Sequence, residues 1–202
     1  MILGLGSFSQ ITAPFTEAFN GTSVPSTWNL RKTSGSDWRF TSLTSFREGG
    51  VIDHTGTAGS SVAWMDFSGT DVNVVLETDT IDVSSISPEL KFWFFSNTRT
   101  STVSPLNTLF VEVYNGSTWV TVGVIQEDPQ VWKEFKYNLV PYVSCSNKIV
   151  IRYRTLSGGS SFDYSHDYAI DDVSVTDCPD CKPAPNDAGA SNITPIQVCP
   201  GN

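Results

Sequence analysis

Two adjacent carboxylates stand inside a strand-like stretch at residues 167–175. Because the side chains of a strand alternate between two faces, Asp171 is expected on the face that carries Val173 and Val175, and Asp172 on the opposite face. A carboxylate among apolar side chains is costly unless it meets backbone donors, a base or a cation. This stretch is therefore the first candidate for a binding or metal site.

Catalytic chemistry finds little support in the sequence. A hydrolytic triad needs a nucleophile beside a base that a third group orients, and the chain has only two histidines, His54 and His166. It contains no nucleophile elbow, zinc-protease motif or phosphate-binding glycine loop. A carboxylate pair for glycoside hydrolysis remains an alternative. We expect no catalytic residue in this segment and no enzymatic activity of its own.

Tryptophans are the other residues whose chemistry fits a ligand. Indole rings form platforms on which the faces of sugar rings stack, and the alternative is that they pack in the interior. Trp93 lies in an apolar stretch, which favours the core. The candidates for an exposed platform are Trp28, Trp38, Trp119 and Trp132.

The charge balance argues against one class of partner. The formal net charge is −9, and charged residues make up 16% of the chain. Binding to a nucleic-acid backbone needs a basic face, so no nucleic acid is expected as a partner. No apolar run approaches the roughly 20 residues of a membrane helix, so we expect no membrane insertion. An acidic chain is compatible with binding a hard cation such as calcium.

The elements that must position these residues are short strands. Apolar residues alternate or run continuously in stretches bounded by Gly, Pro, Ser and Asn, and no helical 3.6-residue stripe is evident. The sequence predicts an all-β fold, an antiparallel two-sheet β-sandwich of the jelly-roll type. The expected strands are 15–19, 62–67, 72–83, 90–95, 109–114, 118–122, 132–139, 148–155 and 168–175. Between 109–114 and 118–122, the pair Asn115-Gly116 predicts a hairpin with a tight type I′ turn.

The two ends differ from the middle of the chain. Residues 1–9 have the apolar run and the small residues Ser7 and Ser9 of a secretory signal remnant; the alternatives are a first strand or a cloning scar. One jelly-roll domain is expected over 10–177 and a stiff linker rich in Pro and Cys over 178–185. Residues 186–202 are too short to fold alone, so we interpret them as the start of a following domain.

Four cysteines in an apparently secreted chain indicate disulfides. If strands 148–155 and 168–175 pair as a hairpin, residues near 145 lie opposite residues near 179. We therefore expect Cys145 to be bonded to Cys178 or Cys181, with a gain of roughly 2–4 kcal/mol. A zinc site at Cys178 and Cys181 is the weaker alternative.

Three pieces of the sequence resemble the MAM domain, an extracellular adhesion module with a two-sheet jelly-roll fold. They are Phe15-Thr16-Glu17-Ala18-Phe19 with a downstream Trp28, Val51-Ile52-Asp53-His54-Thr55-Gly56 and Ala169-Ile170-Asp171-Asp172-Val173, within a resemblance that covers roughly residues 13–177. The chain departs from vertebrate members in having no cysteine before Cys145, and its loop 156–167 has no counterpart that we can map. It is similar too to the anchor-associated and cleaved-adhesin jelly rolls of secreted bacterial proteins.

The resemblance implies a structural calcium ion, because members of these families carry a cation near the first and last strands. Calcium takes six to eight oxygens from carboxylates, carbonyls, amides and water. The alternative is that the carboxylates accept hydrogen bonds from loop N–H groups or pair with Arg47, Arg152 or Arg154. The ligands that the resemblance implies are Glu17, Asp53, Asp66 and Asp171 or Asp172, and Asn20 is a candidate for a further oxygen.

These observations predict a non-catalytic extracellular adhesion or binding module of a larger secreted or cell-surface protein. Its expected partners are an extracellular protein or glycan ligand and the neighbouring domains of the same chain. The alternative is a carbohydrate-binding accessory module of a secreted glycosidase or protease, and a plainer reading is a spacer. An exposed aromatic platform favours sugar, whereas a flat patch favours protein contact.

Overall fold

The computed structural model describes residues 10–42, 51–57, 60–68, 71–98, 103–160 and 162–181, which form strands and single 3-10 turns. One sheet contains β1 (Gln10–Thr12), β3 (Trp28–Arg31), β6 (Val72–Thr78), β7 (Thr80–Asp82), β9 (Thr108–Tyr114), β10 (Trp119–Ile125) and β12 (Lys148–Leu156). The other contains β2 (Phe15–Glu17), β4 (Trp38–Thr41), β5 (Val62–Met65), β8 (Pro88–Ser96), β11 (Lys133–Asn138) and β13 (Tyr168–Asp177). The turns are η1 (Val140–Tyr142), η2 (Asp163–Ser165) and η3 (Pro179–Cys181).

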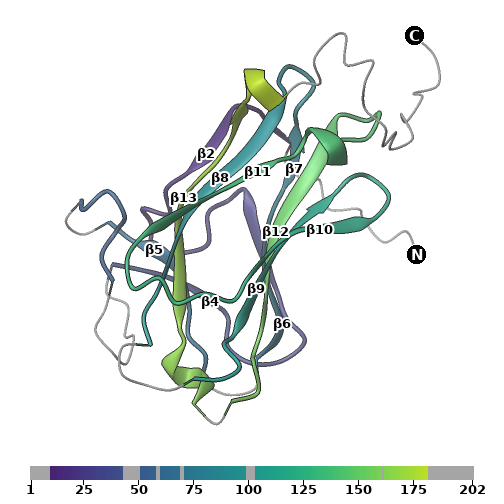
Figure 1. The fold of residues 1–202 in the computed structure, drawn as a ribbon. Coiled ribbons are helices and arrows are strands. Elements are labelled where there is room, and N and C mark those ends of the chain that lie inside the picture. Colours follow the sequence, from purple (N-terminus) through teal and green to yellow (C-terminus); the bar gives the residue numbers. More distant parts are fainter. Residues whose placement is uncertain are drawn as a thin grey trace, which may run out of the picture.

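Each sheet is built around one long strand. In the seven-stranded sheet, β12 pairs with β9 on one side and with β6 and β7 on the other. In the six-stranded sheet, β13 pairs with β8 on one side and with β5 and β2 on the other. Figure 1 shows the two groups of strands facing each other, with β13 and β8 on the left and β12, β9 and β6 on the right. The predicted all-β, two-sheet sandwich is confirmed.

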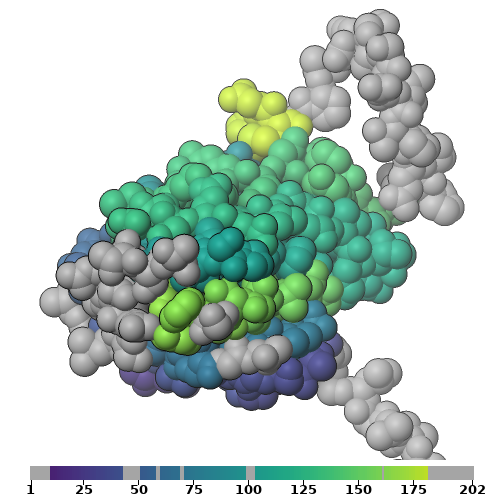
Figure 2. Space-filling view, turned by 60° about the horizontal axis from the view of Figure 1, so that its bottom comes forward, coloured from purple at the N-terminus to yellow at the C-terminus, as the bar shows by residue number. Residues whose placement is uncertain are grey.

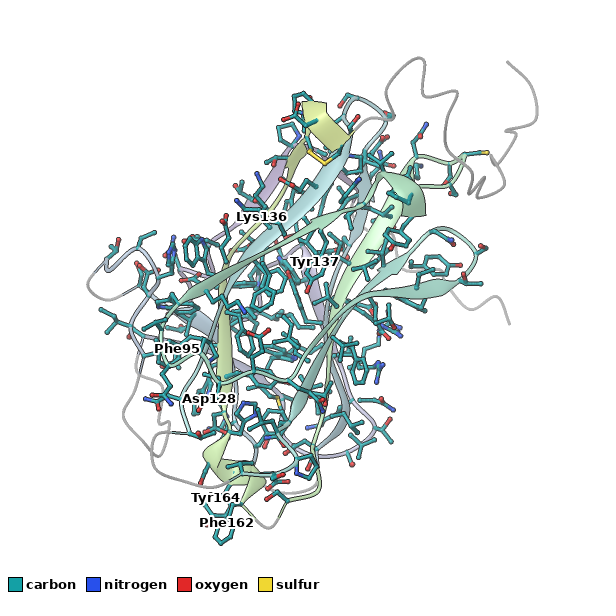
Figure 3. The ribbon with its side chains drawn as sticks, viewed as in Figure 1. Phe95, Asp128, Lys136, Tyr137, Phe162 and Tyr164 are labelled. Atoms are coloured by element: carbon teal, nitrogen blue, oxygen red, sulfur yellow. A yellow bond between two sulfur atoms is a disulfide. The ribbon has the colours of Figure 1, made fainter. Side chains whose placement is uncertain are left out.

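The core fills the space between the sheets. β8 is buried at every second residue, so Leu90, Phe92 and Phe94 point inward while Trp93 points outward. The expectation that Trp93 belongs to the core is therefore wrong. Trp93 lies on the outer face of the sheet, and because other parts of the chain cover this face, it carries apolar residues too. Tyr137 of β11 reaches into the core as well, where its ring occupies the space that a side chain at Gly123 would take (Figure 3).

The predicted hairpin is present, but its turn is longer than expected. β9 and β10 pair with Tyr114 opposite Trp119, which leaves four residues in the loop. The side chain of Asn115 accepts hydrogen bonds from the backbone of Ser117 and Thr118, and Gly116 alone in this loop has a positive φ. The local Asn bonds therefore replace the type I′ turn.

Strands β12 and β13 do not pair with each other, contrary to the assumption behind the predicted disulfide. They are the central strands of opposite sheets, and the connection between them crosses the end of the sandwich. Figure 2 brings this end forward and shows the yellow-green connection between blue and teal segments from earlier in the chain. At its tip, Phe162 and Tyr164 project outward, with Phe162 50% exposed (Figure 3).

One irregularity in β13 decides where the motif carboxylates point. The register against β8 shifts after Asp171, and Asp172 has a φ of 46°, a left-handed conformation that Asp adopts more readily than most residues. Ile170 before the bulge and Val173 and Val175 after it all lie in the core. The expectation that Asp171 shares the face of these valines is therefore wrong, because the extra residue reverses the alternation.

The ends of the chain bear on the predicted domain boundaries only in part. Residues 1–9 and 186–202, expected as a signal remnant and a following domain, lie outside the described residues. Within the expected linker 178–185, Cys178 and Cys181 close a 3-10 turn rather than an extended segment. In the described part of the chain, no helix has the length and apolar character needed to cross a membrane.

His166, one of the two histidines of the chain, is a buried structural residue. Its Nδ1 accepts a hydrogen bond from the backbone N–H of Asn107 at 3.1 Å, so the proton sits on Nε2, which lies 3.1 Å from the carbonyl oxygen of Glu127. Burial lowers the pKa of His166. The neutral imidazole thus joins the loop before β9 to the loop after β10.

We predict that His166 makes the fold less stable in mild acid. Its folded-state pKa lies below the unfolded value, so the stability present above the unfolded pKa near 6.5 is lost as pH falls, at most by about 1.4 kcal/mol per pH unit. Urea unfolding at pH 7.5 and 5.5 should show a larger loss for the wild type than for His166→Gln. The carboxyl groups titrate in both proteins and cancel in this difference, so equal losses would contradict the assignment.

Candidate functional site

The segment 51–57, which carries the Asp-His-Thr motif, covers the outer face of the six-stranded sheet. Val51 packs with Val62 and Trp64 of β5 and with Ala169 of β13 in a small apolar cluster outside the main core. The imidazole of His54 stacks on the outward-facing indole of Trp93, with ring centroids 3.8 Å apart. Apolar contacts therefore hold the motif against β5, β8 and β13.

His54 is also hydrogen-bonded to both carboxylates of the β13 bulge. Its backbone N–H donates to Asp171 Oδ2 at 3.0 Å, and its Nδ1 lies 2.6 Å from Asp172 Oδ2. Trp132 approaches the imidazole edge-on, at 5.8 Å between centroids, and donates its indole N–H to the carbonyl of Ile52. The two sequence motifs, about 117 residues apart, thus meet at one point on the sheet.

Two carboxyl groups touch each other at this point. Asp53 accepts hydrogen bonds from the hydroxyl of Thr55 and the N–H of Thr57, and it is hydrogen-bonded to the side chain of Asp171. Burial raises the pKa of Asp171 to about 7, helped by the charges of Asp172 and Asp53. Burial also opposes ionisation of Asp53, but its hydrogen bonds outweigh this and lower its pKa. Such a pair can hold either a shared proton or a cation.

Glu17 and Asn20 lie along the strand that borders the bulge. β2 pairs with β13 so that Glu17 is opposite Val173, and the first and last predicted strands are neighbours. Glu17 Oε1 accepts a hydrogen bond from the N–H of Phe19 at 2.8 Å, where the chain turns with a positive φ. Asn20 follows on the surface. Glu17 is thus near the carboxylate pair in register and is already bonded to a loop N–H, whereas Asn20 lies beyond the paired residues.

Asp66 lies elsewhere. It follows Met65, which is opposite Tyr168, so about four residues separate it from Asp171 along β13, or about 13 Å at roughly 3.3 Å per residue. Its carboxylate pairs with Arg39 at 2.8 Å. A single ion at Asp171 would not reach it. Among the described residues, three close candidate ligand atoms gather only at Glu89, Cys178 and Cys181, where the sulfurs are already joined.

The disulfide expected between Cys145 and Cys178 or Cys181 is not formed. Cys178 is bonded to Cys181, with Cα atoms 5.2 Å apart, and Cys145 is itself disulfide-bonded, to neither of them. The error follows from the assumed β12–β13 hairpin. The bonded sulfurs also exclude a zinc site at this pair as it stands.

Two of the four predicted platform tryptophans are core residues. Trp28 is 3% exposed and stacks against Tyr153, and Trp38 is 2% exposed and packs against Tyr168. Because their neighbours in the sequence are polar, the sequence does not indicate that Trp28 and Trp38 are buried. Trp119 and Trp132 are partly exposed, on the outer faces of opposite sheets.

The outer face of the seven-stranded sheet carries a row of polar residues that crosses five strands. The members lie directly opposite one another in the register of β3, β6, β12, β9 and β10, and they are Asn29, Glu77, Arg152, Glu112 and Thr121. Arg152 Nε donates to Glu112 Oε2 at 2.6 Å, and Arg154 donates to the same carboxylate at 2.9 Å. Arg31 is ion-paired with Glu77. We call this row the charged ladder.

Arg152 and Arg154 bind Glu112 of the charged ladder and not the motif carboxylates. Arg152 and Arg154 were alternatives to a metal at the motif carboxylates, yet they lie on the opposite sheet. Burial opposes ionisation of Glu112, but hydrogen bonds from both arginines outweigh this and lower its pKa. Burial raises the pKa of Glu77, against the attraction of Arg31 and Arg152. Arg47, the third alternative, lies outside the described residues.

A groove of about 230 Å³ opens beside the charged ladder. Its aromatic wall is Trp119 with Tyr114, whose ring centroids lie 5.4 Å apart. The guanidinium of Arg152 lies over the Trp119 ring at 3.8 Å, which holds the indole in place. The full lining is Asn29, Arg31, Glu77, Thr78, Asp79, Thr80, Tyr114, Trp119 and Val150.

Sequence reasoning identified Trp119 but missed the rest of this groove. Glu77 and Asp79 lie in the expected strand 72–83, within which Asp79 separates β6 from β7. Their meeting with Tyr114 depends on how β6, β12 and β9 are ordered and registered. That order is a long-range property which no local pattern contains.

Comparisons with known proteins place the fold. No family model matches the sequence, and no curated protein does so either. Among solved structures, the K1 cleaved adhesin domain of Lys-gingipain from Porphyromonas gingivalis W83 is 11% identical, with a TM-score of 0.57 over 82% of this chain and 99% of that chain. The K2 cleaved adhesin domain of Lys-gingipain is 17% identical, with the same TM-score of 0.57 over 81% and 99% of the two chains.

A carbohydrate-binding structure shares the fold as well. The CBM22-2 xylan-binding domain of Paenibacillus barcinonensis Xyn10C is 13% identical, with a TM-score of 0.51 over 81% of this chain and 99% of that chain. At these identities the likeness is one of fold. The chain is therefore a jelly-roll β-sandwich, as predicted, of the architecture found in cleaved adhesin domains and carbohydrate-binding modules.

We predict that the charged ladder is a stabilising element. Glu112→Ala should destabilise the fold by roughly 3 kcal/mol, since it leaves two largely buried guanidinium groups without their carboxylate. Chemical unfolding measures this loss. The matched control is Glu134→Ala, which removes the partner of an exposed Lys136 and should cost less than about 1 kcal/mol. Similar losses in the two variants would contradict the prediction.

Proposed function

We propose that this chain is a non-catalytic binding module of a larger secreted or cell-surface protein, and that it attaches its host to an extracellular glycan. The observation that carries the proposal is the groove at Trp119 and Tyr114. A concave site with an aromatic wall and a few fixed polar groups is the usual form of a small-ligand site. Its volume of about 230 Å³ suits a single sugar residue at the groove, with the ligand extending over the sheet.

The aromatic wall supports a sugar more than a flat protein contact. Trp119 is fixed by Arg152, so little side-chain freedom is lost when a ring stacks on it. Glu77, Asp79 and Asn29 offer oxygens and an amide to hydroxyl groups at the floor. The xylan-binding domain that shares the fold supports the same reading.

Adhesion through protein contacts is the second candidate. The cleaved adhesin domains share the fold, and MAM domains, which the sequence resembles, are adhesion modules. The exposed pair Phe162 and Tyr164, at the end of the sandwich, offers apolar side chains to a protein partner. On this reading the module could also contact neighbouring domains of its own chain.

A structural calcium ion at the β13 bulge is part of the proposal. Asp53 and Asp171 lie next to each other, and a cation between them would remove the repulsion between their charges. Asp172, Glu17 and Asn20 border this point, and carbonyls and water would complete the oxygen set that calcium needs. The ion would lock the segment 51–57 and the strand β2 to β13.

We predict that Trp119→Ala weakens glycan binding at least tenfold, because a fixed aromatic side chain in a groove is a typical energetic hot spot. Native gel electrophoresis of the whole chain through soluble polysaccharides measures the retardation. Trp132→Ala, on the opposite sheet, is the matched control and should stay within twofold of the wild type. If no polysaccharide retards the wild type, or if Trp119→Ala is retarded equally, the glycan function is wrong.

We predict that calcium raises the thermal midpoint of the chain relative to EGTA, because an ion that binds only the folded state stabilises it. Asp171→Asn should abolish the rise. Asp37→Asn removes a carboxylate on the surface away from the bulge and should leave the rise unchanged. Equal midpoints of the wild type in calcium and EGTA would exclude the ion.

A further inference from the structure

The charges beside the groove compensate one another. Among the described residues that line or border it, the arginines 31, 152 and 154 are matched by Glu77, Asp79 and Glu112. Five of these six groups are tied into ion pairs with each other. The sixth, Asp79, has no such cation: its carboxylate accepts a hydrogen bond from the amide of Asn29 at 2.9 Å.

The lining and the border of the groove differ in charge: Arg31, Glu77 and Asp79 of the lining sum to −1, and the bordering Arg152, Arg154 and Glu112 sum to +1. Of the charged residues in its lining, Arg31 is neutralised by Glu77, so Asp79 remains as the uncompensated group. Asp79 is only 7% exposed, and its carboxylate is therefore weakly screened by water. A ligand carboxylate or sulfate placed here would be repelled, whereas a hydroxyl would find an acceptor.

The bordering arginines carry one charge more than Glu112, but their N–H donors are not free to bind a ligand anion. The guanidinium of Arg152 faces the Trp119 ring and Glu112, and that of Arg154 is bonded to Glu112 and Asn73, over the ring of Phe110. Their donors are thus directed at groups of the chain itself. Recognition of an anion by arginine requires such donors to be available for bidentate contact.

On the basis of the proposed glycan function, we infer that the groove selects neutral sugars and rejects uronic acids, and that Asp79 is the residue that makes the distinction. The sugar ring stacks on Trp119, and its hydroxyl groups donate to Asp79 and Glu77. The selectivity for neutral sugars then arises from the repulsion between Asp79 and a ligand carboxylate as much as from the contacts with the preferred ligand.

The test uses the whole chain on an array of neutral gluco-, galacto-, manno- and xylo-oligosaccharides, beside the C6-oxidised forms of the three hexose series. We expect binding to at least one neutral series and at least tenfold weaker binding to its oxidised counterpart. Asp79→Asn should narrow this ratio at least threefold. Asp37→Asn changes the net charge equally, at an exposed residue outside the groove, and should leave the ratio unchanged. Circular dichroism confirms that both variants are folded.

Three results would overturn the inference. In the first, oxidised sugars bind as well as neutral ones and Trp119→Ala abolishes the binding of both. The glycan function would then hold, but the groove would not select neutral sugars. Equal effects of Asp79→Asn and Asp37→Asn would assign the selectivity to net charge alone. Absence of binding to every sugar would overturn the proposed function, and the inference with it.

Discussion

The strand β13 has to satisfy three partners at once, and the single extra residue at Asp172 allows it to do so. On one side it pairs with β8, and on the other with β5 and then β2. The bulge lies where the partner changes from β5 to β2. It keeps Ile170 and Val173 in the core, and it turns Asp171 to the outer face. The carboxylate then needs a cover, and the segment that carries His54 supplies it.

The outer faces of the two sheets are stabilised in different ways. The six-stranded sheet covers its outer face with apolar contacts from a loop, including the stack of His54 on Trp93. The seven-stranded sheet leaves its outer face to a network of arginines and carboxylates and to the rings of Trp119 and Phe110. A covered face is suited to stability and an open, fixed one to ligand contact. The groove lies on the open face.

Local sequence patterns predicted what depends on neighbours in the chain. The apolar run of β8 and the turn residues around Asn115 were sufficient to predict a strand and a hairpin, although not which face Trp93 takes. The motif residues Asp53 and Asp171 were also expected near each other, on the strength of a resemblance, and they touch. These features are local, or they were expected from the resemblance alone.

Patterns failed where a distant strand decides the outcome. Trp28 and Trp38 have polar neighbours in sequence, and only the packing of the opposite sheet buries them. The disulfide was misassigned because the chain passes to the other sheet between β12 and β13. The left-handed backbone conformation of Asp172 interrupts the alternation of faces along β13, and a hydrophobic pattern in the sequence does not reveal backbone conformation. The charged ladder likewise exists only once five strands are in register.

The position of β13 in the chain also has a consequence for how the molecule is made. It is the last strand of the described residues, yet it lies in the middle of its sheet, between β8 and the pair β5 and β2. During synthesis the earlier strands leave the ribosome with their edges toward β13 unpaired, and they remain open until the final segment arrives. Such late, long-range pairing gives a high contact order and slow folding, and open edges invite association with other chains. Until β13 is in place, the nascent module therefore exposes unpaired strand edges.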